Sequence, residues 1–167
     1  LFYEMGRRQC LTDSACASLA RDIAALIARD GKRAPQYLAV WNLRLADTLR
    51  AAGLDREAVA AYDQVLHLPA ATPVGPGTPF ADLPAVRREA LLGKAAVLAR
   101  NGALKPSRDI LATFEPTSSR DSLLAAETRL LNGDRVGDLL ARIQADGHPE
   151  RNWGHFYNPL RAAMLAH

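Results

Sequence analysis

A glycine separates two apolar helical segments at three places along this chain, at Gly53, Gly102 and Gly133. Glycine commonly ends a helix because it adopts the left-handed backbone conformation without a steric penalty. The clearest case is the segment QYLAVWNLRLADTLRAAGLDREAVAAYDQVLHL, residues 36–68. It predicts a helix, a tight turn at the glycine and a second helix. Because helical hairpins that recur in this way bury their apolar faces by stacking, the pattern predicts an all-α solenoid.

The amino-acid composition narrows the possible fold class further. The chain has 167 residues, of which 49% are hydrophobic and 6% are aromatic. β-branched residues are scarce and form no alternating run, so we expect no strands. The chain lacks the run of about twenty apolar residues that crosses a bilayer, so we expect no membrane span. Because the chain begins at Leu1 rather than at Met, we expect a processed chain or a piece excised from a longer protein.

The charge pattern bears on the kind of partner. The formal net charge is +3, and arginines are interspersed with Asp and Glu along the chain. This mixture is typical of solvent-exposed helix faces. A surface that binds nucleic acid would instead gather Lys and Arg in one place, so we expect no nucleic-acid partner.

Residues that start and stop helices divide the chain into the parts of one repeat domain. Gly31 is expected to end the first long helix, and Asp55 and Asp82 stand where helix caps are preferred. A stretch dense in Pro and Gly interrupts the helices after Pro69. The predicted parts are N-terminal helices in 1–34, a first repeat in 35–69, a Pro/Gly-rich loop in 70–82, a second repeat in 83–116, a degenerate third repeat in 117–147 and a C-terminal cap in 148–167.

Apolar residues at three- and four-residue steps indicate which face of each helix is buried. After Gly53 this spacing places Val59, Tyr62 and Leu66 inward. Before Gly102 it places Leu91, Ala95 and Leu98 inward.

The spacing of the three glycines indicates a repeat length. They are separated by 49 and 31 residues, and removing the loop of about 15 residues from the first interval leaves about 34, the period of the tetratricopeptide repeat. Small and large side chains keep the same phase in the first two copies: Ala46, Ala58 and Tyr62 around Gly53, and Ala95, Ser107 and Leu111 around Gly102. The third copy keeps Ala126, but Asp138 and Arg142 break the phase after Gly133.

From residue 35 to residue 147 the chain therefore resembles a tetratricopeptide-repeat protein, with an irregular helical bundle as the alternative. The resemblance implies a right-handed superhelix of antiparallel helical hairpins, whose first helices line a concave groove. Arg44, Gly93 and Leu124 occupy positions where the subclass that grips C-terminal carboxylates carries Asn, which argues against that subclass. The groove would carry both signs of charge, so the expected ligand is a polar peptide or a protein surface. The predicted binding residues of this groove are Asp47, Arg50, Glu89, Arg100, Arg120 and Glu127.

Two cysteines, Cys10 and Cys16, bracket a predicted corner of the chain. In one continuous helix they would lie about 9 Å apart along the axis, whereas a disulfide needs Cα atoms about 5.5 Å apart. Thr12, Asp13 and Ser14 favour a helix start between them, which makes a bridge feasible. A disulfide predicts a periplasmic or secreted protein, and two independent small apolar residues would leave a cytoplasmic location open. No His lies near either cysteine, so we expect no metal site.

No group of residues in the sequence has the spacing of a catalytic site. We therefore expect a non-catalytic, cofactor-free scaffold that binds a protein or peptide. Tetratricopeptide-like segments occur in periplasmic parts of bacterial secretion and polysaccharide-export assemblies, which would suit a disulfide. The alternative is a helical enzyme acting on glycans, with Glu89 and Glu127 as paired carboxylates in the groove.

Overall fold

The structure is a computed structural model, and it describes residues 12–115 and 119–135. Throughout these residues the chain forms helices, turns and loops, with no strand, which confirms the all-α class. The predicted helix after Gly133 and the predicted cap in 148–167 lie outside the described residues. The helical elements are α2 (Asp13–Asp30), the 3-10 turn η1 (Pro35–Tyr37), α3 (Leu38–Ala51), α4 (Asp55–Leu66), α5 (Leu83–Arg100), α6 (Leu104–Ala112) and α7 (Ser119–Leu131).

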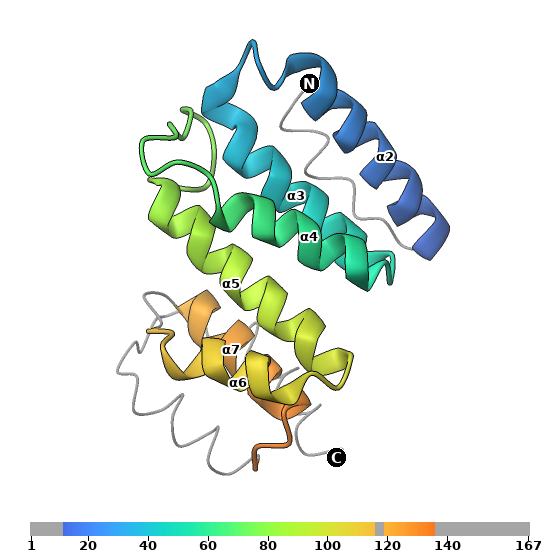
Figure 1. The fold of residues 1–167 in the computed structure, drawn as a ribbon, viewed down its shortest axis with the longest axis vertical. Helices are drawn as coiled ribbons and strands as arrows, with labels where there is room; N and C mark the ends of the chain where they lie inside the picture. The colour runs from blue at the N-terminus through green and yellow to red at the C-terminus, as the bar shows by residue number, and fades with distance from the viewer. Residues whose placement is uncertain (1–11, 116–118, 136–167) are drawn as a thin grey trace.

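The helices pack as consecutive hairpins (Figure 1). α3 and α4 form one hairpin, α5 and α6 form the next, and α2 packs against α3. α5 is the central element, because it contacts α3 and α4 on one side and α6 and α7 on the other. α3 and α5, the first helices of the two described hairpins, are therefore direct neighbours, and α7 packs on the other side of α5.

The three turn glycines have the backbone conformation that the sequence predicts. Gly53, Gly102 and Gly133 have φ values of 71°, 75° and 85°. In the first turn the Leu54 amide donates to the Leu49 carbonyl over 3.0 Å, which satisfies one of the last carbonyls of α3. Gly31 also ends its helix, but with a right-handed φ of −58°, so that turn does not require a glycine for its backbone angles.

Helix starts are only partly as predicted. Asp82 caps α5, since its Oδ1 accepts a hydrogen bond of 2.8 Å from the Ala85 amide. Asp55 does not cap α4: the cap residue is Leu54, which makes no side-chain cap bond, and Asp55 is the first residue of the helix. The prediction for Asp55 was wrong because its carboxylate instead pairs with Arg100 on α5, a contact between helices that local spacing does not show.

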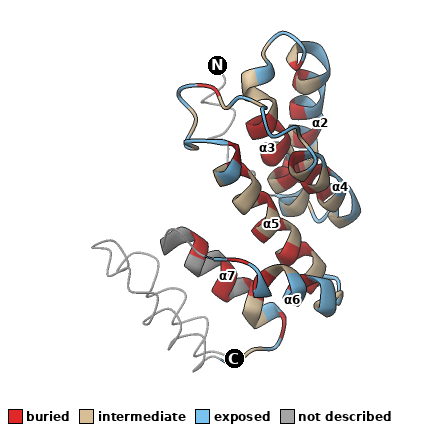
Figure 2. Ribbon diagram, turned by 60° about the vertical axis from the view of Figure 1, so that its left-hand side comes forward, coloured by how far each residue is buried: buried red, intermediate tan, exposed pale blue. Residues whose placement is uncertain are grey.

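The buried face of α5 differs from the predicted one. Ala95 is buried as expected, but Leu91 and Leu98 are only partly buried, and Leu92 and Val97 are buried instead. Figure 2 shows buried residues along the whole of α5. A helix that packs on both sides has no single apolar stripe, so the three- and four-residue steps misplaced its core residues. On α4, Tyr62 is fully buried as predicted, whereas Val59 and Leu66 are partly buried.

The Pro/Gly-rich loop between α4 and α5 is held against the end of η1. The Gly75 amide donates to the Gln36 carbonyl over 2.7 Å. Gly75 also lies against the Tyr37 ring, where an added Cβ would be 2.6 Å from Cε1. Val74 and Phe80 pack against the core.

Candidate functional site

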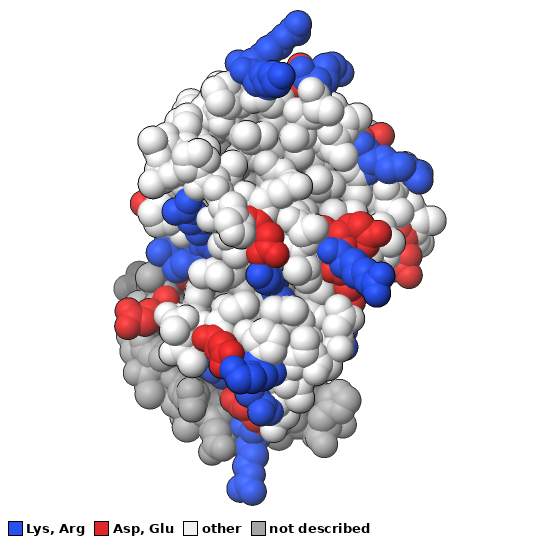
Figure 3. Space-filling model, viewed as in Figure 1, with Lys and Arg blue, Asp and Glu red and all other residues white. Residues whose placement is uncertain are grey.

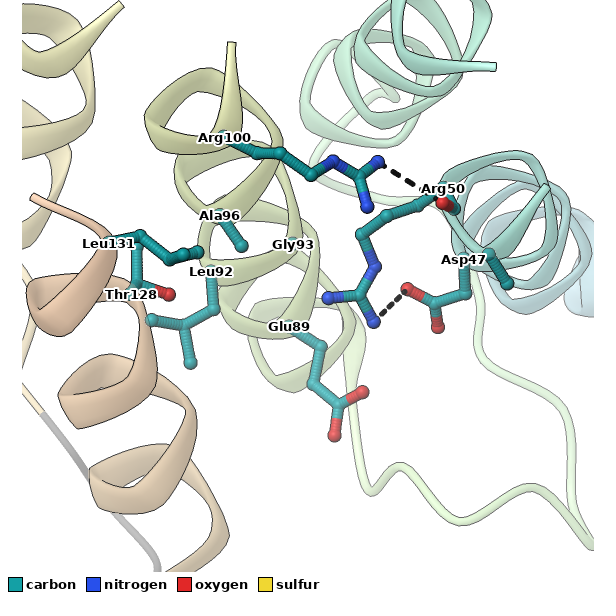
Figure 4. Close-up of a pocket in the computed structure, with 10 residues that line it drawn as sticks. Asp47, Arg50, Glu89, Leu92, Gly93, Ala96, Arg100, Thr128 and Leu131 are labelled. Carbon is teal, nitrogen blue, oxygen red and sulfur yellow. Dashed lines mark hydrogen bonds and ion pairs between the residues drawn. The ribbon is translucent and has the colours of Figure 1, made fainter. Parts of the chain in front are cut away.

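A pocket of about 280 Å³ lies between α3, α5 and α7. All of its lining residues come from these three helices, of which α3 and α5 are the first helices of the two described hairpins. The pocket brings together four of the predicted groove residues, Asp47, Arg50, Glu89 and Arg100 (Figure 4). The remaining lining residues are Ala51, Leu92, Gly93, Ala96, Thr128 and Leu131.

The other two predicted groove residues, Arg120 and Glu127, belong to α7, but their side chains lie outside the described part of the structure. Their place in the groove stays a prediction. Sequence reasoning also missed the apolar lining, which Leu92, Ala96 and Leu131 provide. For α5 a signal was available, because Leu92 and Ala96 fall between Glu89 and Arg100 at the three- and four-residue steps of one helix face.

A buried tyrosine on α4 supports one wall of the pocket. The Tyr62 hydroxyl donates a hydrogen bond of 2.7 Å to Oδ1 of Asp47. Its ring packs directly on Gly93 of α5, where an added Cβ would lie 2.6 Å from the Tyr62 Cε1 atom. Burial, and next the negative charge of Asp47, raise the pKa of Tyr62 far above its ordinary value of 10.0. Tyr62 therefore stays protonated and keeps the Asp47 carboxylate in one orientation.

Asp47 and Arg50 face each other one helical turn apart on α3 (Figure 4). The Arg50 Nη2 atom lies 3.8 Å from the Asp47 Oδ1 atom, an ion pair too long for a hydrogen bond. The Arg50 side chain is 34% exposed and the Asp47 side chain is 26% exposed. Within the part of the chain that the structure describes, the Arg50 guanidinium donates no hydrogen bond and Oδ2 of Asp47 accepts none. Both groups thus keep hydrogen-bonding capacity that faces the pocket.

Arg100 lines the pocket but is engaged in contacts between helices. Its Nε and Nη2 atoms form a two-pronged pair with the Asp55 carboxylate at the start of α4. Nη2 also donates to the main-chain carbonyl of Arg50 over 3.2 Å. Arg100 therefore joins the end of α5 to the end of α3 and the beginning of α4, and it fixes the backbone from which the Arg50 side chain extends.

The pocket has mixed charge and some apolar surface, and its described carboxylates are not deeply buried. Asp47 is about one quarter exposed, and Glu89 is partly buried. On the face drawn in Figure 3, acidic and basic side chains lie next to each other across the middle of the molecule. Among the described residues, no group of three or more His, Cys, Asp and Glu side chains could hold a metal ion.

Cys16 lies at the start of the fold, away from the pocket residues. Thr12 caps α2, with its Oγ1 accepting from the Ala15 amide over 3.3 Å, so the helix begins between the two cysteines as predicted. Cys16 is buried and is not a free thiol. Cys10 lies outside the described residues, so its pairing with Cys16 stays a prediction. No helix among the described residues is long and apolar enough to cross a membrane.

No protein-family model matches this chain, and comparison with curated proteins and with solved structures gives no match either. Its resemblance to tetratricopeptide repeats therefore depends on the residues themselves. In the structure these residues form packed helical hairpins, which are compatible with a helical repeat.

Proposed function

We propose that this chain is a non-catalytic binding module of the tetratricopeptide-like type, and that a segment of a partner protein or peptide occupies the pocket between α3, α5 and α7. The observation that carries the proposal is the origin of the lining residues. They come from α3 and α5, the first helices of the two described hairpins, and from α7, which packs beside α5, and a superhelical repeat would present such a surface as its groove. Asp47, Arg50, Glu89 and Arg100 lie there together, as a shared groove requires.

The chemistry of the pocket favours binding over glycan cleavage. A glycosidase needs a carboxyl group that its apolar surroundings keep protonated, placed opposite a second carboxylate. The described carboxylates of the pocket, Asp47 and Glu89, are both partly exposed, and Asp47 is paired with Arg50 and accepts a hydrogen bond from Tyr62. A small pocket with both signs of charge suits the polar rim and apolar centre of a protein interface better.

The setting of such a module is proposed from the resemblance alone. Tetratricopeptide-like segments occur in the periplasmic parts of bacterial secretion and polysaccharide-export assemblies, and we propose that this chain belongs to such an assembly. A disulfide between Cys10 and Cys16 would suit that oxidising environment.

Capture from the native extract with matched baits tests the proposal. Arg50→Glu reverses a charge inside the pocket, whereas Arg56→Glu makes the same reversal at an exposed position of α4 that does not line it. A partner of the pocket is expected to be retained by the wild type and by Arg56→Glu but not by Arg50→Glu, because like charges in contact weaken association strongly.

The captured partner is then purified, and its affinity for the three baits is measured by titration calorimetry. Equal affinity for the Arg50→Glu and Arg56→Glu baits would overturn the assignment of the pocket as the binding surface. Circular dichroism of each bait establishes that the reversals leave the helices intact.

A further inference from the structure

We infer that the pair of Asp47 and Arg50 binds the main chain of an extended peptide. The pair would form hydrogen bonds with both the N–H and the C=O of a single peptide residue. This inference rests on the proposed function, because it names how the pocket would hold a partner segment. It concerns the subsite formed by these two side chains together with the apolar lining beside them, for which we use the name main-chain subsite.

The first observation is the unused hydrogen-bonding capacity of the pair. The Asp47 carboxylate accepts the Tyr62 hydroxyl at Oδ1, and its Oδ2 atom accepts nothing among the described residues. The Arg50 guanidinium, 3.8 Å from Oδ1, donates no hydrogen bond there. One strong acceptor and one strong donor thus lie side by side at the pocket, each partly exposed.

The second observation is that the Asp47 carboxylate and the backbone of Arg50 are held in place from behind. The Tyr62 hydroxyl fixes Asp47, and the Tyr62 ring is itself fixed against Gly93. On the other side, Arg100 binds the main-chain carbonyl of Arg50 and ties it to α4 through Asp55. An acceptor held in this way loses little conformational entropy when a ligand arrives.

The geometry of an extended chain matches an adjacent acceptor and donor. In a hydrogen-bonded pair of residues on antiparallel strands, each residue uses both its N–H and its C=O to bond the residue opposite, because both groups point to the same side. Asp47 would accept that N–H and Arg50 would donate to that C=O. A ligand that carries only one charge fits less well, since the member of the pair with the same sign as the ligand would repel it.

The apolar lining lies next to this pair and suits a neighbouring side chain of the same peptide. Leu92 is fully buried, while Leu131 is 51% exposed, and both line the pocket. Successive side chains of an extended peptide point to opposite faces. A residue whose main chain lies at the pair would therefore place one adjacent apolar side chain over Leu92, Ala96 and Leu131.

The test uses a randomised pool of octapeptides with both ends blocked, so that no terminal charge takes part. Peptides that the wild-type protein retains are identified by mass spectrometry, and the tightest is resynthesised with one amide at a time N-methylated. Methylation at a single amide is expected to weaken binding about tenfold or more, because it removes one hydrogen bond to a charged acceptor.

The matched variant is Asp47→Asn. Its amide oxygen still accepts from Tyr62, but its NH₂ group replaces the free acceptor Oδ2. The same N-methylation is expected to cost less than about twofold in this variant, whereas Arg56→Gln retains the full loss. Circular dichroism checks the fold of both variants.

The outcomes separate the two proposals. If peptides bind but tolerate methylation at every amide, or if Asp47→Asn shows the same loss as the wild type, the main-chain subsite is wrong and the binding module stands. If the wild-type protein retains no peptide that competes with the captured partner, the peptide-binding function and the subsite are both overturned.

Discussion

At the scale of single residues, the contact between Tyr62 and Gly93 connects packing to the pocket. The ring can approach α5 only because position 93 lacks a Cβ, and this approach puts the hydroxyl within 2.7 Å of Asp47. Position 93 is one where the tetratricopeptide pattern had drawn attention only to a missing Asn. The reason for its glycine is a contact with another helix, which a single sequence does not reveal.

The raised pKa of Tyr62 predicts how stability depends on pH. In the unfolded chain Tyr62 loses its proton near pH 10, whereas burial keeps it protonated in the folded chain. Its contribution to the free energy of unfolding is therefore complete below pH 10 and is lost progressively as the pH rises further, by at most about 1.4 kcal/mol per pH unit. Urea unfolding between pH 8 and 11 measures this decline. Tyr62→Phe is expected to show a shallower decline, and equal slopes for the two proteins would contradict this account of Tyr62.

Gly53 allows a test of the turn itself, because an added Cβ would meet nothing within 4 Å. Its φ of 71° is costly for a β-branched residue. Gly53→Val is therefore expected to lower the free energy of unfolding by about 1 kcal/mol or more, measured by urea denaturation. Gly53→Asn, which tolerates this conformation better, serves as the control and should cost less. A neutral effect of valine would mean that α3 ends in another way.

At the scale of elements, what could be predicted depended on how many neighbours an element has. The turns at Gly53 and Gly102 and the cap at Asp82 are local, and spacing alone located them. The buried face of α5 could not be read in this way, since α5 packs against helices on both sides. The same limit applies to Asp55, whose partner Arg100 lies 45 residues away in the sequence.

The revised face of α5 can be checked by truncating two adjacent leucines. Leu92 is 1% exposed, and Leu92→Ala is expected to reduce the free energy of unfolding by about 2–5 kcal/mol through loss of burial and the cavity left behind. Leu91 is only partly buried, so Leu91→Ala should cost clearly less. Chemical denaturation of both variants gives the comparison. A larger loss for Leu91→Ala would restore the face predicted from spacing and contradict the packing described for α5.

At the scale of the whole molecule, four of the six predicted groove residues lie at one pocket because α3 and α5 pack directly against each other. The position of each residue relative to its turn glycine was therefore enough to predict that these residues of α3 and α5 lie together. The apolar lining and the support from Tyr62 depend on packing between hairpins. Positions counted from the glycine of a single hairpin do not reveal those contacts.

The predicted disulfide concerns the environment in which the whole molecule works. Free thiols of the denatured, non-reduced protein can be counted with a thiol reagent. We expect none, because the start of α2 at Asp13 leaves Cys16 in the first turns of the helix and allows a bridge to Cys10. Two titratable thiols in freshly isolated protein would remove the argument for a periplasmic or secreted protein.

Photo-crosslinking from Leu131 tests the claim that the pocket between α3, α5 and α7 holds a partner segment. Leu131 lines the pocket and is half exposed, so a photoreactive phenylalanine analogue there would touch an occupant without entering the core. The same analogue at Arg56, exposed on α4, is the control. We predict that the captured partner crosslinks through one short segment to position 131 and not to position 56. Crosslinking at position 56 alone, or equally at both positions, would contradict the claim.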